Sequence, residues 1–377
     1  MKVAMIGHKV VPSRRGGIER VLTVLCPLLA ERGAQVVCYN RRGEKIENEY
    51  VGTAEDGSYQ GVRLKWAPTM KVKGISAVIS SFTAAIAASF GGYDVIHFHA
   101  EGPCAAMWIP KLLGKRCIAT VHGLDWQREK WGKGFASRYI HFGEKVMVRC
   151  ADEIIVLSEP AREYFRETYG RQTHVIPNGT ARPRLVPAEQ ITERFGLEKD
   201  SYICMVSRLT EEKGIHLLIE AYQKLKTDKK LVIAGDASDT DSYVARLKEM
   251  AAGNENILFT GFISGQCLEE LYSNAYAACL PSYLEGMSLS LLEALSYGNA
   301  VVCSDIPENT CVAEDHAVYF RRGDREELAQ QLQKILDEPT LCQTLKDSAA
   351  DFICEKYAWD SVADDTYRLY LGEKSTV

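Results

Sequence analysis

The chain has 377 residues, of which 46% are hydrophobic and 25% charged, and this composition excludes the disordered, collagen-like and fibrous classes. The formal net charge of −5 conceals an asymmetry, because residues 1–180 carry a net charge of +8 and residues 181–377 a net charge of −13. The basic half suits an anionic ligand or an anionic membrane face, whereas dispersed basic residues without an aromatic–basic motif disfavour nucleic acid.

Short β-branched runs alternate with helical runs along the whole chain. In the first half the predicted strands are 2–7, 34–40, 94–99, 116–122 and 153–158, and the predicted helices are 17–32, 75–90 and 103–113. In the second half the predicted strands are 202–207, 230–236, 257–262, 277–282 and 300–305, and the predicted helices are 213–226, 242–252, 266–275 and 288–297. Apolar strands that alternate with helices predict parallel sheets covered on both faces. Two such series predict an α/β protein with two Rossmann-like, doubly wound parallel-sheet domains.

The domain boundary is predicted within residues 175–187, where three prolines and a glycine interrupt the pattern and the charge balance changes sign. The predicted domains are residues 1–178 and residues 179–355, followed by a C-terminal helix within 356–377 that is expected to pack back on the N-terminal domain. Open parallel sheets bind ligands beyond the carboxyl ends of their strands, so a cleft between the two domains is the expected active site.

The cysteines and the first residues of the chain indicate the cellular compartment of the protein. Twelve cysteines run from Cys26 to Cys354 without a C-x-x-C pair, so we expect buried thiols in a reducing compartment rather than disulfides or a zinc site. The first apolar run is too short for a signal peptide, and residues 75–90 are too few to span a bilayer. These features predict a cytoplasmic protein.

Two segments after predicted strands could hold phosphate. The basic loop at residues 7–20 carries the paired glycines Gly16 and Gly17 at a helix entry, where backbone N–H groups and the helix dipole favour an anion. After the strand 202–207, Arg208 and Lys213 combine a guanidinium fork with a mobile point charge, which suits a diphosphate. The alternative for the first segment is a plain helix-entry turn. The alternative for the second is a solvated turn in which Glu211 and Glu212 are the partners of these cations.

A third segment, residues 283–298, contains two glutamates separated by seven residues. If the whole segment were helical, Glu285 and Glu293 would be rotated by about 80° and lie about 12 Å apart, which suits a ligand with hydroxyls at both ends and phosphates between them. The N–H groups around Met287, Ser288 and Leu289 would hold those phosphates. The alternative is that both glutamates are ordinary surface residues of a helix.

Together with Pro-Asn-Gly at 177–179, these segments resemble retaining glycosyltransferases of family 4, which have the GT-B fold. Residues 7–20 and 120–131 are most similar to a bacterial subgroup that includes rhamnosyltransferases of polysaccharide assembly. The resemblance implies an acceptor-side N-terminal domain and a nucleotide-sugar-binding C-terminal domain that face each other across a cleft. It implies retaining, metal-independent transfer of a hexose such as rhamnose from a nucleotide-diphosphate sugar to a hydroxyl of a glycan or lipid-linked acceptor in cell-surface polysaccharide synthesis.

The resemblance also implies roles for individual residues. Arg208 and Lys213 would hold the diphosphate, Glu285 the donor-sugar hydroxyls and Glu293 the ribose. The implied catalytic residues are His122, Arg208, Lys213 and Glu285. The implied donor-binding residues are Gly16, Gly17, Gly261, Phe262, Gly286, Met287, Ser288, Leu289 and Glu293. The acceptor-side candidates are Arg15, Trp126 and Arg128, and neither a metal nor a cofactor beyond the nucleotide-sugar co-substrate is expected.

Several alternatives stay open. His97 and His99 alternate with apolar neighbours and could form a metal pair, although hydrogen-bonded structural histidines are the favoured interpretation. Asp236 stands where the family often has glycine. A sugar-nucleotide epimerase of the same fold and a non-catalytic nucleotide-sugar binder are the rival functions. The basic half, with the apolar helix at 75–90, further predicts peripheral contact with an anionic membrane.

Overall fold

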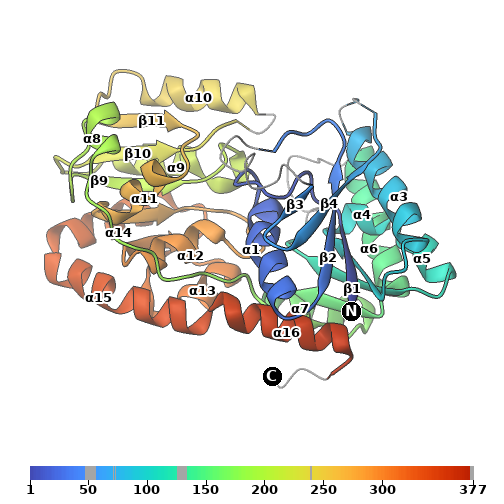
Figure 1. The fold of residues 1–377 in the computed structure, drawn as a ribbon. Helices are drawn as coiled ribbons and strands as arrows, with labels where there is room; N and C mark the ends of the chain where they lie inside the picture. The colour runs from blue at the N-terminus through green and yellow to red at the C-terminus, as the bar shows by residue number, and fades with distance from the viewer. Residues whose placement is uncertain (47–56, 71, 73, 125–133, 238–239, 374–377) are drawn as a thin grey trace. The chain divides into compact units, whose positions relative to one another are not determined.

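The computed structural model describes the chain except residues 47–56, 71, 73, 125–133, 238–239 and 374–377. The chain divides into two compact units: unit 1 consists of residues 1–179 and 359–377, and unit 2 of residues 180–358. Each unit is built on one β-sheet with helices packed against it (Figure 1). None of the described helices combines the length and the apolar character that crossing a bilayer requires.

Unit 1 contains an eight-stranded sheet. Its strands are β1 (Lys2–Ile6), β2 (Gln35–Arg41), β3 (Ser58–Tyr59), β4 (Val62–Ala67), β5 (Val95–His99), β6 (Arg116–Val121), β7 (Glu153–Val156) and β8 (His174–Val175). Its helices are α1 (Gly17–Glu31), α3 (Ile75–Ser89), α4 (Glu101–Cys104), α5 (Trp108–Leu112), α6 (Phe135–Cys150), α7 (Glu159–Tyr169) and α16 (Trp359–Leu371). The order is β3-β4-β2-β1-β5-β6-β7-β8, and every neighbouring pair is parallel except the β3–β4 hairpin. Figure 1 shows α1 on one side of this sheet and α3, α4, α5 and α6 on the other.

Unit 2 contains a six-stranded, fully parallel sheet in the order β11-β10-β9-β12-β13-β14. Its strands are β9 (Tyr202–Val206), β10 (Lys230–Ala234), β11 (Ile257–Gly261), β12 (Ala277–Leu280), β13 (Ala300–Ser304) and β14 (Val318–Phe320). Its α-helices are α8 (Gln190–Phe195), α9 (Ile215–Tyr222), α10 (Asp241–Ala251), α11 (Gln266–Ser273), α12 (Leu289–Ser296), α13 (Pro307–Ala313), α14 (Arg325–Asp337) and α15 (Pro339–Lys356). Short 3-10 turns lie at η3 (Glu211–Lys213) and η4 (Glu314–His316).

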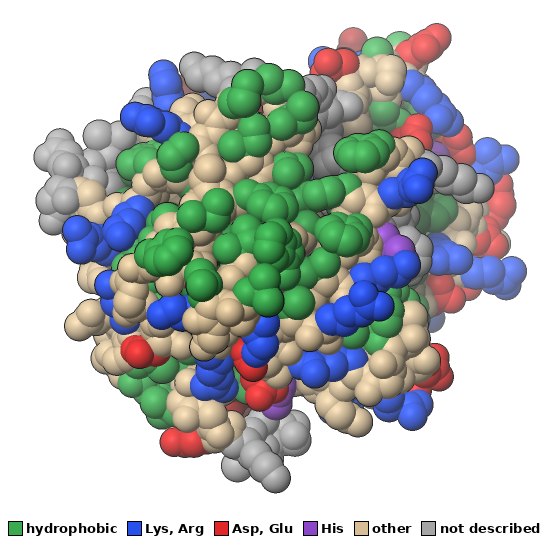
Figure 2. Space-filling model, turned by 90° about the vertical axis from the view of Figure 1, so that its right-hand side faces the viewer, with side chains coloured by type: hydrophobic (Ala, Val, Ile, Leu, Met, Phe, Trp, Pro, Cys, Tyr) green, Lys and Arg blue, Asp and Glu red, His purple; other side chains and the backbone are tan. Residues whose placement is uncertain are grey.

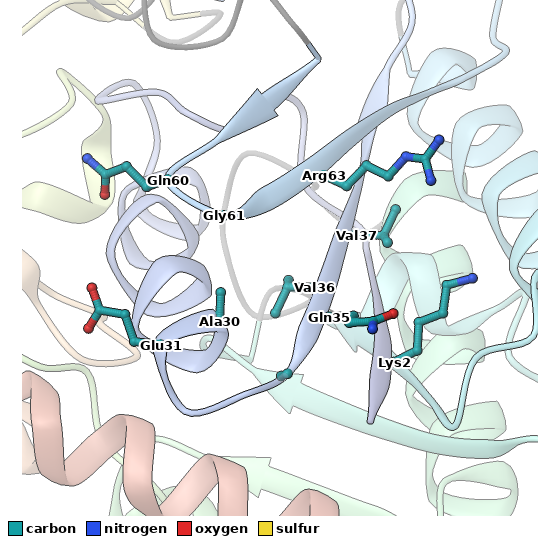
Figure 3. A pocket seen from close by; sticks show the side chains of 10 residues that line it. Lys2, Ala30, Glu31, Gln35, Val36, Val37, Gln60, Gly61 and Arg63 are labelled. Atoms are coloured by element: carbon teal, nitrogen blue, oxygen red, sulfur yellow. The ribbon is translucent and has the colours of Figure 1, made fainter.

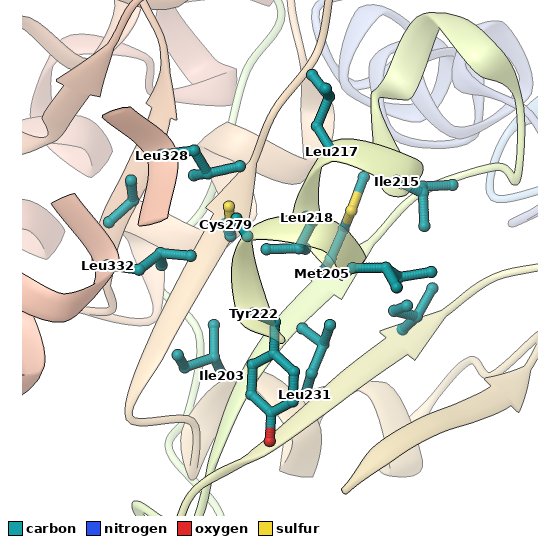
Figure 4. Packing of buried hydrophobic residues seen from close by; sticks show 14 of the residues in the cluster. Ile203, Met205, Ile215, Leu217, Leu218, Tyr222, Leu231, Cys279, Leu328 and Leu332 are labelled. Atoms are coloured by element: carbon teal, nitrogen blue, oxygen red, sulfur yellow. The ribbon is translucent and has the colours of Figure 1, made fainter. Parts of the chain in front are cut away.

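The core of unit 2 explains why its strands are apolar throughout. Ile203 and Met205 of β9 belong to a buried cluster with Leu218 of α9 and Leu328 of α14 (Figure 4). Cys204, between the two β9 residues, is equally buried, and alternation along a strand directs it to the opposite face of the sheet. Both faces are therefore covered, which is why β9 has no alternating polar residues.

The predicted fold class is confirmed, and each of the ten predicted strands is present with its ends within two residues of the prediction. The single helix predicted over 103–113 is wrong, because α4 ends at Cys104 and α5 begins at Trp108. Pro110 lies in the first turn of α5, where a proline is tolerated, but its ring disfavours a helix that continues into it from α4. The helix predicted over 213–226 is shorter, covering Ile215–Tyr222 after a 3-10 turn.

The C-terminal helix α16 packs within unit 1. Arg32 of α1 donates to Asp364 at 2.6 Å, and Arg116 of β6 donates to the carbonyl oxygen of Tyr370 at 2.6 Å. The Tyr370 hydroxyl lies 2.6 Å from Nδ1 of His97 in the middle of the sheet, and both side chains are buried. The helix α16 is thus joined to the rest of unit 1 by one buried polar contact and two more accessible ones.

We expect Tyr370→Phe to destabilise unit 1 by about 1–3 kcal/mol, because it leaves a buried nitrogen of His97 without its partner. The measurement is the free energy of unfolding from denaturant titration. Tyr367→Phe is the matched control, since Tyr367 lies on the same helix and is only half-buried. Equal losses in the two variants would contradict the assignment.

Candidate active site

The candidate site in unit 2 forms where two neighbouring strands end. β9 and β12 are adjacent and parallel, so the segments that follow them leave the sheet at the same edge. Arg208 and Lys213 follow β9, and residues 283–289 follow β12. The two segments are hydrogen-bonded, because the backbone N–H of Tyr283 donates to the carbonyl oxygen of Glu212 at 2.8 Å. The fold therefore joins two of the three predicted segments.

Gly214 permits this close approach. Its φ angle is +67°, in the left-handed region that favours glycine, and it caps the η3 turn before α9 begins. A Cβ atom on Gly214 would lie 2.1 Å from the carbonyl oxygen of Pro281 in the β12–α12 loop. Any side chain at this position would force the two loops apart.

Lys213 and Glu285 form the central ion pair of the site. The Lys213 Nζ donates to Glu285 Oε1 at 2.6 Å, and the two side chains are only 15% and 8% exposed. The hydroxyl of Ser282 donates to the same carboxylate oxygen at 2.7 Å. Two of the predicted catalytic residues are thus in direct contact, and a ligand that binds Lys213 must compete with Glu285.

Arg208 is the more accessible cation. Its side chain is 41% exposed, and its guanidinium lies 3.4 Å from Oε1 of Glu212, a residue that is almost fully buried. A single long contact of this kind orients the guanidinium without saturating its five donors. Donors of Arg208 therefore remain for an incoming anion.

The segment before α12 differs from the helical geometry assumed above. The helix begins at Leu289, and the Ser288 hydroxyl accepts from the N–H of Leu291 at 3.3 Å as its N-cap. Glu285 lies in the loop before that cap, so the all-helical segment assumed for the separation of about 12 Å is not formed. Glu293 sits within α12 and is half-buried, while Met287 is buried beneath the loop.

The remaining predicted residue pair of unit 2 ends the strand β11. Gly261 has φ +70° and accepts from the N–H of Gly235 at 3.0 Å, while Phe262 is 39% exposed. Asp236 follows Gly235, and its carboxylate accepts from the N–H of Ala237 at 2.8 Å. The unusual aspartate therefore stabilises its own turn.

In unit 1 the paired glycines lie at the start of α1. Gly16 is the N-cap with φ +96°, Gly17 is the first helical residue, and both are exposed together with Arg15. Beneath them the buried Glu19 accepts from the N–H of Lys9 at 2.8 Å. Burial raises the pKa of Glu19 above its ordinary value. The start of α1 thus presents exposed backbone above a buried carboxyl group.

His122 ends a row of histidines at the carboxyl ends of β5 and β6. Its Nε2 lies 3.1 Å from Nδ1 of His99, whose ring lies 4.2 Å from that of His97 between centroids. His97 bonds Tyr370 through one nitrogen and Thr120 through the other, at 2.7 Å. The predicted hydrogen-bonded structural role of His97 therefore fits its contacts.

Possible metal-ligating side chains are dispersed over the described part of the chain. No group of three or more His, Cys, Asp or Glu side chains gathers there in a way that could hold an ion. The sequence contains one Asp-x-Asp, at 239–241, whose Asp241 opens α10 and whose Asp239 lies outside the described residues. The acceptor-side candidates Trp126 and Arg128 also lie outside them.

Two surface pockets lie away from the predicted residues. One of about 490 Å³ in unit 1 is lined by the last turn of α1, the first residues of β1 and β2 and the β3–β4 hairpin (Figure 3). It opens at the amino ends of parallel strands, where ligands rarely bind. The other, of about 560 Å³, lies in unit 2 between α9 and the start of α14. Neither contains a predicted site residue.

The sequence did not predict the contributions of Gly214 and Ser282, whereas Glu212 is the partner of Arg208 that the solvated-turn alternative expected. Gly214 closes the segment SRLTEEKG, so its position at the end of a turn was the available signal. The side chains of Ser282 and Glu212 contact residues three and four positions away, Glu285 and Arg208. Only the Glu212 carbonyl oxygen reaches a distant segment, where it accepts from the N–H of Tyr283. A further carboxyl group near the pair is Glu308, whose pKa is raised by burial and, to a lesser extent, by Glu285.

The family comparisons match both halves of the chain. Residues 15–181 match the model described as Glycosyltransferase Family 4, and residues 188–352 match the model described as Glycosyl transferases group 1. The chain is 23% identical to the alpha-maltose-1-phosphate synthase of Mycolicibacterium smegmatis, over 98% of this chain and 99% of that protein. It is 27% identical to a glycogen synthase of Mycobacterium tuberculosis, over 74% of this chain and 69% of that protein.

Solved structures establish the GT-B fold. HepE of Anabaena, in complex with UDP and glucose, has a TM-score of 0.80 at 17% identity, covering 99% of this chain and 100% of that one. Sucrose-phosphate synthase from Thermosynechococcus elongatus has a TM-score of 0.77 at 22% identity, with 98% of both chains covered. WaaG, a glycosyltransferase involved in lipopolysaccharide biosynthesis, has a TM-score of 0.75 at 16% identity, with 98% and 100% covered.

We expect Gly214→Ala to destabilise unit 2 by about 2 kcal/mol or more, because the added methyl group meets the Pro281 carbonyl and the backbone is left-handed. Thermal or denaturant unfolding measures the loss. Gly253→Ala is the control, since Gly253 has φ +83° but open space around its Cβ position. A Gly214 variant no less stable than the control would show that the close approach does not matter.

Unit 1 should lose stability as the pH falls below about 6.5. Burial lowers the pKa of His8 to about 4 and that of His97 to about 3. Below about pH 6.5 these histidines are therefore protonated in the unfolded chain while they stay neutral in the folded chain, and protonation favours the unfolded state. Below 6.5 each histidine removes about 1.4 kcal/mol of stability per pH unit, until its folded pKa is reached. The measurement is the free energy of unfolding from denaturant titration at several pH values between about 7 and 5. Its slope against pH should be smaller by about one proton in His97→Gln than in the unaltered protein. Identical slopes in the two proteins would contradict this account.

Proposed function

The chain is a glycosyltransferase made of a family 4 domain followed by a group 1 domain, and on this premise we propose that it moves a hexose from a nucleotide-diphosphate sugar to a hydroxyl of a glycan or lipid-linked acceptor. The proposal includes retention of anomeric configuration and independence of a metal ion. Synthesis of a cell-surface polysaccharide from the cytoplasm is the proposed setting.

The observation that carries the proposal is the convergence of two cations and a helix start at one sheet edge. Arg208 and Lys213 follow β9, and the N–H groups at Ser288 and Leu289 open the eight-residue α12. A guanidinium, an ammonium and a helix N-terminus each favour phosphate oxygens. Together they would neutralise the diphosphate of the bound donor and of the leaving group.

Lys213 would exchange its carboxylate partner for the diphosphate when the donor binds. In the structure its ammonium group is paired with Glu285 at 2.6 Å. A diphosphate carries more negative charge than one carboxylate, so it would draw the ammonium group toward itself. Glu285 would then accept hydrogen bonds from donor-sugar hydroxyls, and Glu293 of α12 would accept them from the ribose.

The proposed reaction breaks the bond between the anomeric carbon and the diphosphate oxygen. The acceptor hydroxyl oxygen forms the new bond on the face that the diphosphate leaves, and its proton passes to a phosphate oxygen. Negative charge grows on the leaving group in the transition state, so fixed donors at Arg208 and Lys213 act where they lower the barrier. No protein nucleophile is required.

The other residues keep the roles that the family resemblance implies. His122 would contact the donor sugar, and Gly16 and Gly17 would offer backbone N–H groups to phosphate. Gly261 and Phe262 would lie beside the base. Arg15, Trp126 and Arg128 would belong to the acceptor side.

The identity of the donor rests on weaker support. HepE is described with UDP and glucose, which favours a uridine nucleotide as the first donor to test. The relatives named above are synthases of maltose phosphate, glycogen and sucrose phosphate, so rhamnose stays a prediction from the subgroup resemblance.

The deciding experiment incubates the protein with a panel of nucleotide sugars, with and without glycan acceptors, and follows both glycosylated product and released nucleoside diphosphate. Product that requires an acceptor supports the transferase. An isomerised donor formed without acceptor would identify the epimerase alternative. Donor binding that stabilises the protein without turnover across the panel would identify a non-catalytic binder.

We expect Arg208→Ala and Lys213→Ala each to lower kcat by roughly a hundred- to a thousand-fold, equivalent to about 2.7–4 kcal/mol, because each removes one donor to the leaving diphosphate. Initial rates at saturating donor measure the loss, and circular dichroism checks the fold. Lys224→Ala is the control, since Lys224 makes an exposed ion pair with Glu326 outside the site. Near-normal turnover in either site variant would remove that residue from the mechanism.

A further inference from the structure

One face of unit 1 exposes an unusual amount of apolar surface. Figure 2 looks onto the side of the molecule that carries α3, α5 and α6 and shows a continuous area of hydrophobic side chains there, bordered by lysines and arginines. Eleven of the fifteen large hydrophobic side chains that are exposed in the described chain lie between Trp66 and Phe142. We call the exposed surface of these three helices the α3–α5–α6 face.

The helix α3 contributes a surface without charge. None of its fifteen residues, Ile75–Ser89, is charged. Three of its serines, Ser80, Ser81 and Ser89, are buried. The partly exposed Thr83 donates to the carbonyl oxygen of Ile79 on the same helix at 2.9 Å. With hydroxyls bonded to its own backbone, α3 presents little unsatisfied polarity to its surroundings.

The short helix α5 extends this apolar surface beside α3, with which it is in contact. Trp108 is exposed, and Leu112 is 77% exposed although leucine normally favours the interior. Lys111, on the same helix, pairs with Asp152 at 2.5 Å, so a cation borders the apolar residues. An indole and a leucine beside a lysine are typical of a membrane–water interface.

The helix α6 adds an aromatic and cationic stripe. Phe135, Arg138, Phe142, Lys145 and Arg149 recur every three or four residues, so they share one side of the helix, and all five are exposed. The acidic residue of α6, a buried glutamate, faces inward and accepts from two tyrosines of α7. The outer side of α6 is therefore aromatic and positive.

We propose that the α3–α5–α6 face adsorbs to the surface of an anionic lipid bilayer. Its apolar centre would enter the boundary between headgroups and acyl chains, and its basic border would lie against anionic headgroups. A second copy of the chain fits this face less well, because a symmetric dimer through it would bring the basic borders of both copies together. The inference goes beyond the proposed function, since lipid adsorption needs neither donor nor turnover.

The test is co-sedimentation of the full chain with vesicles. Vesicles of equal parts phosphatidylglycerol and phosphatidylcholine should bind the protein about tenfold or more tightly than phosphatidylcholine alone. Rising salt should weaken this binding without abolishing it, because only the electrostatic part is screened. Equal binding to both vesicles, or no binding to either, would overturn the proposal.

Two double variants locate the contact. Phe135→Glu with Phe142→Glu removes aromatic anchors, and Arg138→Glu with Lys145→Glu reverses the border charge. Each should weaken binding to the anionic vesicles about tenfold or more. All four residues are exposed, and circular dichroism confirms that the variants fold.

Matched changes elsewhere serve as controls. Leu185→Glu replaces an exposed apolar residue of unit 2, and Arg246→Glu with Lys248→Glu reverses two exposed cations of α10. These variants should bind vesicles like the unaltered protein, and the α6 variants should keep their transfer rate on a soluble acceptor. Control variants that bind vesicles as weakly as the α6 variants would contradict a lipid-binding face. So would a dimer, observed in sedimentation equilibrium, that dissociates in the phenylalanine variants.

Discussion

The contact between Gly214 and the carbonyl oxygen of Pro281 is the constraint on which the rest of the candidate site depends. Adjacent parallel strands already bring the ends of β9 and β12 to one sheet edge, but only a residue without a Cβ lets the two loops touch. The hydrogen bond from Tyr283 to Glu212 and the pair between Lys213 and Glu285 both follow from that approach. Backbone geometry thus sets the position of the charges.

The charges themselves are arranged for exchange rather than for static stability. A lysine and a glutamate that are both mostly buried pay a desolvation cost, which their mutual attraction offsets while they are paired. An arriving diphosphate offers Lys213 a stronger partner and releases Glu285 for neutral hydroxyls. Arg208, held by one long contact and largely exposed, needs no such release. Arg208 is therefore suited to the first contact with the diphosphate, and Lys213 to binding it once the pair with Glu285 has opened.

The sequence predicts ten strands well because each is a short apolar run bounded by polar turns, and the buried Cys204 shows why both faces of β9 are apolar. It does not predict β3, β8 and β14, which have two or three residues, or β4, in which charged residues alternate with apolar ones. It predicts helices less well where proline or a tight turn intervenes, as at Pro110 and Gly214. The direct contact between Lys213 and Glu285 was beyond it, since 72 residues separate them. The helix assumed to run through Glu285 is not formed, because the Ser288 cap places that glutamate outside α12.

The same limit applies to the surface, where the basic balance of the first half is visible in the sequence but only folding gathers its cations around the apolar side of α3, α5 and α6.

The central claim concerns the diphosphate, and the most direct measurement is a crystal structure of the protein with UDP. The account predicts diphosphate oxygens within hydrogen-bond distance of the Lys213 ammonium and the Arg208 guanidinium, with Glu285 no longer paired to Lys213. UDP bound elsewhere, with the Lys213–Glu285 pair intact, would contradict it.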